Sequence, residues 1–371
     1  MVPEKTERGR CMVNRRNILI GGGAAVAAGA AAWALAPRPD YAGLAAAIRD
    51  PGPPQDDLAS LAAHATLAAN GHNTQPWLFS RAGDRVTIAP DFSRATPVVD
   101  PNDHHLFASL GCAAENLMLA AAAAGRPAES RFVEDGDGSV EIDLASGAAA
   151  RDPLFDAIPA RQSTRSLYDG RPVSAGDLKA IEQAAALAGA RVLIVTDEKK
   201  IEQMLEMIVA ANTAQTDDPA FRKELKDWLR FGPRAAVAKR DGLYAPCSGN
   251  PALPDWLGHA IFDHVFTTQG ENDKYAAQIR SSAGLAVIVS NANNRAHWVE
   301  AGRACQRFAL ATTARGIRQA FLNQPLEVAA MREDFVRWLG DDALSPDMIL
   351  RFGHADPLPF SLRRPVAEVI V

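Results

Sequence analysis

Residues 71–77 read G-H-N-T-Q-P-W, a polar stretch between a helical pattern and an apolar run. An amide, a hydroxyl and a second amide stand side by side at residues 73–75. Pro76 lacks a backbone donor and favours an extended conformation for Gln75. The apolar run that starts at Trp77 predicts a strand. A loop of this kind can present its amides to a flat, heteroatom-rich ring, or it can be an ordinary helix-to-strand connection with Trp77 in the core.

The composition bounds the class of protein. The chain has 371 residues, 47% of them hydrophobic, which is enough for a large core and one or two domains. Its net charge of -5 argues against binding to nucleic acid, because like charges repel. The four cysteines are far apart and form no C-x-x-C motif, so no zinc site is predicted. His104 and His105 are adjacent and would point in different directions, so we expect a helix start there rather than metal ligands.

The N-terminus has the pattern of a targeting segment. Residues 1–17 are polar and basic, while residues 18–36 carry no charge and end in an A-x-A cleavage pattern. Arg15 and Arg16 resemble the pair of a twin-arginine signal. Such a signal would pass the folded protein, with its cofactor in place, to the twin-arginine export machinery and on to the periplasm or cell envelope. Residues 18–36 could also just span a bilayer, so a membrane anchor is the alternative, which the glycines at 21–23 disfavour.

Hydrophobic periodicity predicts the elements of a first half, residues 41–150. The expected helices are residues 41–49 and 58–70, and the expected strands are 77–79, 86–88, 131–133 and 140–144. Between the two strand pairs lies a long helix, residues 106–124, which has almost no charge and ends at Gly125. A helix that is apolar on all sides is normally central in a fold.

A second half, residues 151–371, resumes the same alternation with one interruption. The expected strands are residues 191–196, 285–289 and 348–352, and the expected helices are 175–187, 199–211, 297–315 and 326–339. Residues 212–280 hold charged helices and a proline-rich loop instead, and we call this segment the insert. Long inserts often act as lids, and a peripheral helical decoration is the alternative.

The two long helices resemble each other. Residues 110–125 and 301–316 align without a gap, and six of the sixteen positions are identical, including Gly111 with Gly302 and Gly125 with Gly316. Strand-like sequence follows each copy. The pattern predicts two related halves in one chain, packed around two long central helices.

Two further motifs join the first: R-Q-S-T-R at residues 161–165 and S-L-R-R-P-V at residues 361–366. In this order, with the twin central helices, the motifs resemble those of the FMN-dependent nitroreductase family. The resemblance implies an α+β fold, which in this family usually forms homodimers with an FMN at each interface. Here the first half has the N-T-Q-P-W loop and the second has the R-x-S-x-R motif. This arrangement resembles the Acg-type branch, where one chain imitates the dimer, and it implies one FMN per chain.

By the same resemblance, Arg161 and Ser163 hold the FMN phosphate, joined by Arg363 from the C-terminal tail. Guanidinium groups suit phosphate because they donate two parallel charged hydrogen bonds. Ser361 occupies a position where the family can have a second cationic residue, so Arg364 is expected to help bind the phosphate.

The resemblance also assigns contacts to the rest of the flavin. Arg165 would reach the pyrimidine edge or the ribityl chain, where a positive charge favours the reduced flavin. The remaining expected contacts are Asn73 and Thr74, with His72 or Gln75 behind them, and the loop of Asn323 after the second central helix.

Two functions of different classes follow. No Ser-His-Asp set, carboxylate pair or P-loop is present, so the flavin would carry the chemistry and the protein would position it. The first function is an FMN oxidoreductase that reduces a flat acceptor such as a nitroaromatic or a quinone. The second is an FMN-sequestering protein whose insert closes over the ring; the export signal favours it, since the NAD(P)H pool is cytoplasmic. A flavin fold without a cofactor is a third possibility.

Overall fold

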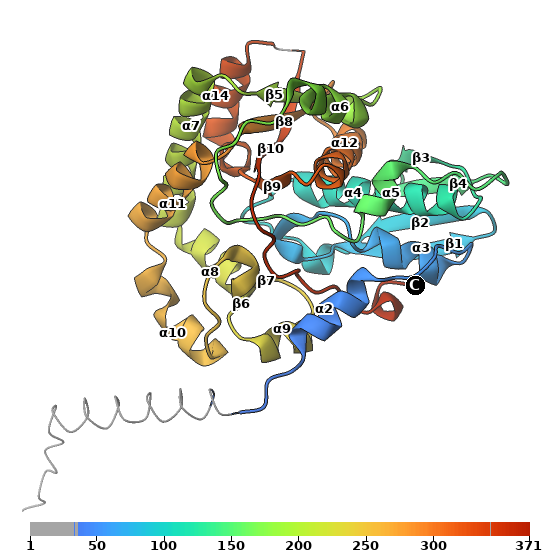
Figure 1. Ribbon diagram of the computed structural model, residues 1–371, viewed down its shortest axis with the longest axis horizontal. Coiled ribbons are helices and arrows are strands. Elements are labelled where there is room, and N and C mark those ends of the chain that lie inside the picture. Colours follow the sequence, from blue (N-terminus) through green and yellow to red (C-terminus); the bar gives the residue numbers. More distant parts are fainter. Residues whose placement is uncertain (1–32, 34–35, 342) are drawn as a thin grey trace, which may run out of the picture. The chain divides into compact units, whose positions relative to one another are not determined.

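The structure, a computed structural model, describes residue 33, residues 36–341 and residues 343–371. Residues Asp40–Val371 form one compact unit. The predicted signal segment, residues 1–36, lies outside the described residues except at Trp33 and Ala36, and its export function stays a prediction. In the compact unit, helices pack against two four-stranded antiparallel sheets, which confirms the expected α+β class (Figure 1).

The first sheet contains the four strands expected in the first half. Their order is β1 (Trp77–Ala82), β2 (Arg85–Pro90), β4 (Ser139–Leu144) and β3 (Ala128–Val133), and every neighbouring pair is antiparallel. Along β4, buried and partly buried residues alternate, as expected for a strand with one face on the core. The long helix α4 (His104–Ala123) follows β2 in the chain and precedes β3.

The second sheet repeats the arrangement of the first. Its order is β5 (Ala190–Val195), β8 (Gly284–Ser290), β10 (Ser345–Gly353) and β9 (Arg318–Phe321), again antiparallel throughout. In the chain, the long helix α12 (Arg295–Ala314) follows β8 and precedes β9. Both sheets therefore have the same succession of strand, strand, helix, strand and strand, and the same spatial order. The strand-like sequence expected after Gly316 forms the short strand β9, which carries Arg318 and Gln319.

The two long helices pack directly on each other, and two glycines make the contact possible. A Cβ atom on Gly111 would lie 2.0 Å from the carbonyl oxygen of Val299, and one on Gly302 would lie 1.9 Å from that of Ala108. These contacts are reciprocal between the helices. Both helices are largely buried, which confirms their central position. By length and composition α4 could cross a membrane, but most of it lies inside the core of the described chain.

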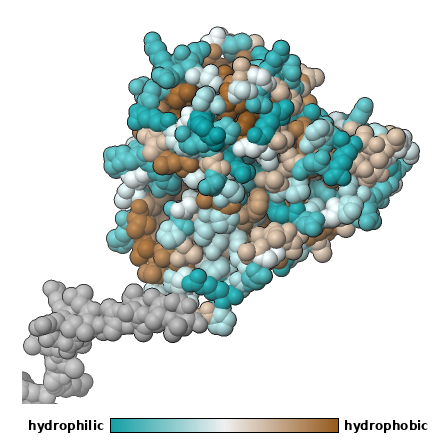
Figure 2. Space-filling view, viewed as in Figure 1, coloured by the Kyte–Doolittle hydropathy of each residue, from teal (hydrophilic) through white to brown (hydrophobic). Residues whose placement is uncertain are grey.

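A long connection between β5 and β8 contains the predicted insert. Its helices are α7 (Glu198–Asp217), α8 (Pro219–Asp227), α9 (Pro233–Lys239), α10 (Asp255–Val265) and α11 (Thr268–Arg280), and β6 (Leu229–Arg230) pairs with β7 (Leu243–Tyr244). In the first sheet the matching connection is the short turn at Gly83. Apolar patches on the left of Figure 2 lie where Figure 1 has α10, whose Trp256 and Val265 are exposed.

The remaining helices are α2 (Tyr41–Arg49), α3 (Leu58–Ala65), α5 (Pro153–Ala157), α6 (Ala175–Ala185), α13 (Gln324–Glu327) and α14 (Ala329–Leu339), with a short η1 turn (Gly71–Asn73). The helix expected at residues 58–70 ends early, at Ala65. After Ala65 the backbone follows a 3-10 pattern, because the N–H groups of Leu67 and Ala68 each donate to the carbonyl three residues earlier. The hydroxyl of Thr66 also donates to the Ala63 carbonyl. The early end leaves the carbonyls of residues 66–68 free for other donors.

Replacing Gly302 by alanine should destabilise the fold severely. The added methyl group would meet backbone atoms of Ala108 in α4, so the helices would have to move apart, at a cost of about 3 kcal/mol or more. Urea unfolding of Gly302→Ala measures this cost. Gly176→Ala is the matched control, because a Cβ there meets nothing closer than 3.8 Å and alanine favours the helix. Equal urea midpoints for both variants would show that the helix crossing tolerates a larger separation.

Candidate functional site

The loop at residues 71–77 has an unusual backbone. His72, Asn73 and Gln75 have φ angles of 44°, 55° and 56°, which place three non-glycine residues in the left-handed region. The extended conformation expected for Gln75 is therefore wrong. Each such residue costs free energy and persists only where the surroundings fix it, which is common at functional sites.

The side chain of Gln75 supplies much of this fixation. Its Oε1 accepts a hydrogen bond from the backbone of Arg364 at 2.7 Å, and its Nε2 donates to the carbonyl of Arg240 at 2.9 Å. Its own backbone N–H donates to Oδ1 of Asn70 at 2.9 Å. Gln75 is fully buried. These bonds override the preference that Pro76 imposes, and they occupy both ends of the Gln75 amide.

Asn73 and Thr74 connect the loop to the tail and to the insert. Oδ1 of Asn73 accepts from Nη1 of Arg363 at 2.8 Å, and its Nδ2 donates to the carbonyls of Gly242 and Leu362 at 3.0 and 3.2 Å. The carbonyl of Thr74 accepts from Nε of Arg94, whose guanidinium also pairs with Asp241 of the insert. The insert and the C-terminal tail thus both hold this loop in place.

Arg161 and Arg363 are buried beside the end of α3, with 3% and 4% of their surfaces exposed. Nη2 of Arg161 donates to the carbonyl of Leu67 at 2.9 Å, and Nε of Arg363 donates to that of Thr66 at 2.7 Å. Burial lowers the pKa of Arg161 to about 10 and that of Arg363 to about 9. Nε of Arg161 has no partner in the described chain.

Three more arginines lie close by, and the five together are called the arginine cluster: Arg49, Arg161, Arg165, Arg351 and Arg363. The charges of Arg49, Arg161 and Arg363 act on one another, as do those of Arg165 and Arg351, and Cys247 is near members of both sets. The other groups that act on them are tyrosines and cysteines, and among the described residues no carboxylate forms an ion pair with any of the five. Five buried or partly buried guanidinium groups therefore share one region without a counter-charge from the protein.

Arg165 and Arg351 extend the cluster toward the second sheet. Nη2 of Arg351 donates to the carbonyl of Ser166 at 2.8 Å, and its guanidinium lies 4.0 Å from the ring centre of Tyr168. Arg165 remains partly exposed, yet burial lowers the pKa of its guanidinium. Ser163 is also partly exposed and bridges to Gln319 on β9, so this segment runs beside the sheet.

His72 brings the first loop to the second motif. Its Nδ1 is buried without a partner. Burial, then the positive charge of Arg165 and the nearby His105, lowers the pKa of His72 to about 4. Arg165 also acts on Tyr275 of α11, where burial raises the pKa of the phenol to about 12. His72, Arg165 and Tyr275 are partly exposed, yet burial is the main cause of the pKa shift of each.

Asn323 and Arg364 have other partners. Oδ1 of Asn323 accepts from the backbone N–H of Ile349 at 2.9 Å. The next residue, Gln324, is buried, and its Oε1 has no partner in the described chain. Arg364 pairs with Asp91 at 3.4 Å and donates to the carbonyl of Glu368, so carboxylates and carbonyls already engage the cation expected to assist at the phosphate.

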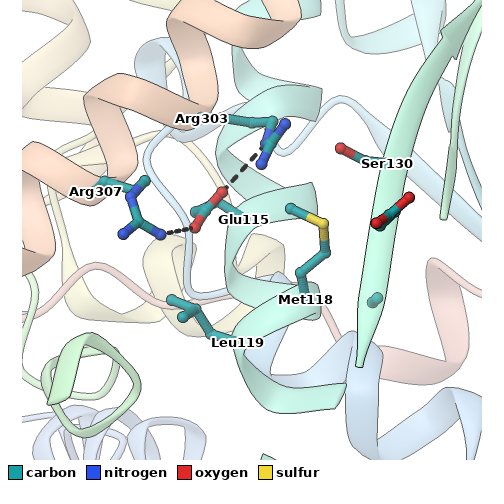
Figure 3. Close-up of a pocket in the computed structure, with 8 residues that line it drawn as sticks. Glu115, Met118, Leu119, Ser130, Arg303 and Arg307 are labelled. Atoms are coloured by element: carbon teal, nitrogen blue, oxygen red, sulfur yellow. Dashed lines mark hydrogen bonds and ion pairs between the residues drawn. The ribbon is translucent and has the colours of Figure 1, made fainter. Parts of the chain in front are cut away.

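A separate pocket of about 410 Å³ lies where α4, α12 and β3 meet (Figure 3). The buried Glu115 pairs there with Arg303 at 3.2 Å and with Arg307 at 2.6 Å. Met118 and Leu119 line the same pocket. Its cations are neutralised within the protein, in contrast to the arginine cluster, so this pocket does not call for an anionic ligand. No group of three or more potential metal ligands occurs among the described residues.

The sequence motifs missed two members of the arginine cluster. Arg351 lies in the middle of a buried apolar strand, where a charge is costly, and that position alone could have singled it out. Arg49 ends a short apolar helix and belongs to no motif, so only the tertiary structure shows that it meets Arg161.

No protein-family model matches the chain. It is 27% identical over 341 residues to two Mycobacterium tuberculosis proteins, from strains CDC 1551 / Oshkosh and ATCC 25618 / H37Rv, both provisionally named NAD(P)H nitroreductase. The match covers 88% of this chain and 94% of each relative. This likeness over most of the chain supports the resemblance to FMN-binding nitroreductases that the three motifs carry.

Solved structures give a weaker likeness. A Desulfitobacterium hafniense nitroreductase with bound FMN has a TM-score of 0.37 and 17% identity, over 58% of this chain and 96% of that one. The FMN-dependent nitroreductase NfnB of Mycobacterium smegmatis, in complex with NADPH, gives the same score and identity over 55% and 88%. TM-scores of this size do not establish a common fold.

Changing His72 should alter how stability depends on pH. The pKa of His72 is about 4 in the folded chain, below the ordinary value of 6.5, so the unfolded chain binds the proton first as the pH falls. The free energy of unfolding of the ligand-free protein should therefore rise from pH 4 to 6.5, with a contribution from His72 of at most about 1.4 kcal/mol per pH unit. Urea unfolding of His72→Gln should lack this contribution.

His264→Gln is the control for this measurement, because His264 is exposed on α10. The control should keep the pH dependence of the natural chain. If His72→Gln kept it too, burial and Arg165 would not lower the pKa of His72 in the folded chain.

Proposed function

We propose that the chain is an FMN-dependent oxidoreductase of the nitroreductase type, with one flavin site between the loop at residues 71–77 and the arginine cluster. The observation that carries the proposal is the buried arginine cluster without a carboxylate. Burying a charge without a partner costs desolvation free energy. A fold that buries several positive charges together therefore fits a negatively charged ligand. The phosphate dianion of FMN has that charge.

The phosphate would bind at Arg161 and Arg363, as the sequence motifs predict. Both guanidinium groups use part of their donors on backbone carbonyls, which fixes their position, and Nε of Arg161 is left over. Charged hydrogen bonds from guanidinium to phosphate are strong and directional. Ser163 lies in the same segment with its side chain partly exposed. The residues present therefore fit a phosphate group.

The polar edge of the flavin would face Arg165 and His72. Bound FMN supplies the two-electron chemistry, and the protein supplies orientation and electrostatics. The positive charge of Arg165 would stabilise negative charge on the reduced cofactor, and the neutral His72 can donate or accept one hydrogen bond through its free Nδ1. The unpartnered Oε1 of Gln324 and Oγ of Ser166 add polar groups near Tyr275 and Arg351. A flat acceptor such as a nitroaromatic or a quinone is the proposed substrate class.

The single site follows from a fused pseudo-dimer, which we propose on the topology. The two sheets share one strand order, and the central helices touch through a reciprocal pair of glycine contacts. Only the first half supplies the strained loop before its first strand, and only the second supplies the R-Q-S-T-R segment. The chain therefore contains one loop and one R-Q-S-T-R segment, which together can form one flavin site.

We expect the purified full-length chain to carry about one FMN, because one loop and one arginine cluster form one site. The measurement is the visible spectrum, with the flavin released and quantified per chain after soaking in FMN. Arg161→Ala should retain much less FMN, whereas Arg303→Ala, in the neutralised pocket of Figure 3, should retain it. Two FMN per chain would contradict the single site, and none would contradict the proposed function.

A second candidate function, sequestration of FMN, is favoured by the contacts of the insert. The turn at residues 240–242 donates to and accepts from the loop at Asn73 and Gln75. Asp241 of the same turn pairs with Arg94, which holds the Thr74 carbonyl. An insert fastened in this way beside the site would keep a bulky nicotinamide donor out.

A variant that loosens the turn at residues 240–242 distinguishes the reductase from the sequestering protein. Asp241→Ala removes the ion pairs to Arg94 and Arg230, and a loss of about 1–2 kcal/mol would raise the open population about 5- to 30-fold. If the insert blocks the donor, NADPH should bleach the flavin of the variant faster by a similar factor, while dithionite should act equally on both proteins. Stopped-flow absorbance measures the two rates.

Asp263→Ala is the control for this experiment, because among the described residues Asp263 forms ion pairs only with Arg222 and Lys226, both in the insert. It should leave both rates unchanged. Rapid bleaching of the natural protein by NADPH, at the rate of the Asp241 variant, would exclude a closed insert and favour the reductase.

A further inference from the structure

Helix α2 (Tyr41–Arg49) docks on the C-terminal tail through both of its ends. At its start, the hydroxyl of Tyr41 donates to the carbonyl of Phe360 at 2.7 Å. At its end, the guanidinium of Arg49 lies 4.5 Å from the ring centre of Phe360, and its Nη1 donates to the carbonyl of Arg161 at 2.9 Å. The helix therefore carries a cation directly to the segment that holds the R-Q-S-T-R motif.

The surroundings of Arg49 are electrostatically unfavourable. Only 7% of its surface is exposed, and its Nε has no partner in the described chain. Burial, then the positive charges of Arg363 and Arg161, lowers the pKa of Arg49 well below the ordinary value. The other groups that act on it are Cys247 and Tyr41. A buried guanidinium beside two others, with a donor to spare, is the arrangement expected around a multiply charged anion.

We propose that Arg49 is a third phosphate-binding arginine, and that the phosphate group of the cofactor fastens helix α2 onto the rest of the compact unit. The proposal rests on the proposed FMN site and adds a residue that none of the three motifs contains. The unpartnered Nε atoms of Arg49 and Arg161 are the two donors that the phosphate oxygens would satisfy.

A purely structural role for Arg49 explains less. Its Nη1 donates to the carbonyls of Arg161 and Pro159 at 2.9 and 3.4 Å, which a neutral NH2 group could also do without placing a third charge beside Arg161 and Arg363. The stacking on Phe360 needs a flat group but no anion. Neither contact accounts for the free Nε. A phosphate accounts for the charge and for the free donor together.

The first test compares FMN with riboflavin, which lacks the phosphate. The full-length protein is stripped of flavin and titrated with each ligand, and binding is followed by flavin fluorescence. Arg49→Met should weaken FMN binding roughly 10- to 100-fold, the effect of one charged hydrogen bond, and leave riboflavin binding unchanged. Arg191→Met, at an exposed position on β5, is the matched control and should change neither. Equal weakening of both ligands, or no change in either, would overturn the proposal.

The second test uses the natural chain, so it does not depend on a variant that folds. Hydrogen exchange of the amides in Tyr41–Arg49 is measured with FMN, with riboflavin and with inorganic phosphate. FMN and phosphate should slow the exchange, and riboflavin should not. Equal protection by riboflavin, or protection by none of them, would overturn the role of the phosphate. If the chain bound no FMN but phosphate still protected α2, the anion site would stand and the proposed flavin function would fail.

Discussion

The close crossing of α4 and α12 is the constraint on which the architecture depends. Backbone meets backbone there at Gly111 and Gly302, and a Cβ atom at either position would lie within about 2 Å of a carbonyl oxygen. In the chain, each helix connects two strands of its own sheet, α4 joining β2 to β3 and α12 joining β8 to β9. The crossing therefore sets the separation of the two sheets, and with it the distance between the loop before β1 and the tail after β10, which meet at Asn73 and Arg363.

The arginine cluster is tolerated because backbone carbonyls surround it. Since α3 ends early, the carbonyls of residues 66–68 are free, and Arg161 and Arg363 donate to all three. Carbonyl groups at a helix C-terminus carry partial negative charge, which offsets part of the desolvation cost. They do not neutralise a cation, and they leave Nε of Arg161 without a partner. The protein thus fixes these side chains in position while leaving charge available for a ligand.

The sequence predicted what depends on local pattern. The helical patterns at residues 106–124 and 297–315 predicted both central helices, and the glycine pair in their alignment turned out to be the contact between them. The sequence-based prediction was wrong or silent where contacts between residues far apart in the chain determine the conformation. Pro76 favours an extended Gln75, but the hydrogen bonds that Gln75 accepts from Arg364 and donates to Arg240 and Asn70 impose the left-handed conformation instead. The place of Arg49 in the cluster depends on tertiary packing and could not be seen in the sequence.

The two sheets share a topology, and the difference between them lies in one connection. A turn at Gly83 joins β1 to β2, whereas five helices join β5 to β8. This connection returns across to the first half, where residues 240–242 hold the strained loop through Asn73 and Gln75. The second half thus supplies four of the five arginines of the cluster, all but Arg49, and also the segment that fixes the facing loop. Since the first half has only a turn at the corresponding place, it has no such segment to offer in return. Under the proposed fused arrangement, the asymmetry of this one connection would account for one complete site between two halves of similar topology.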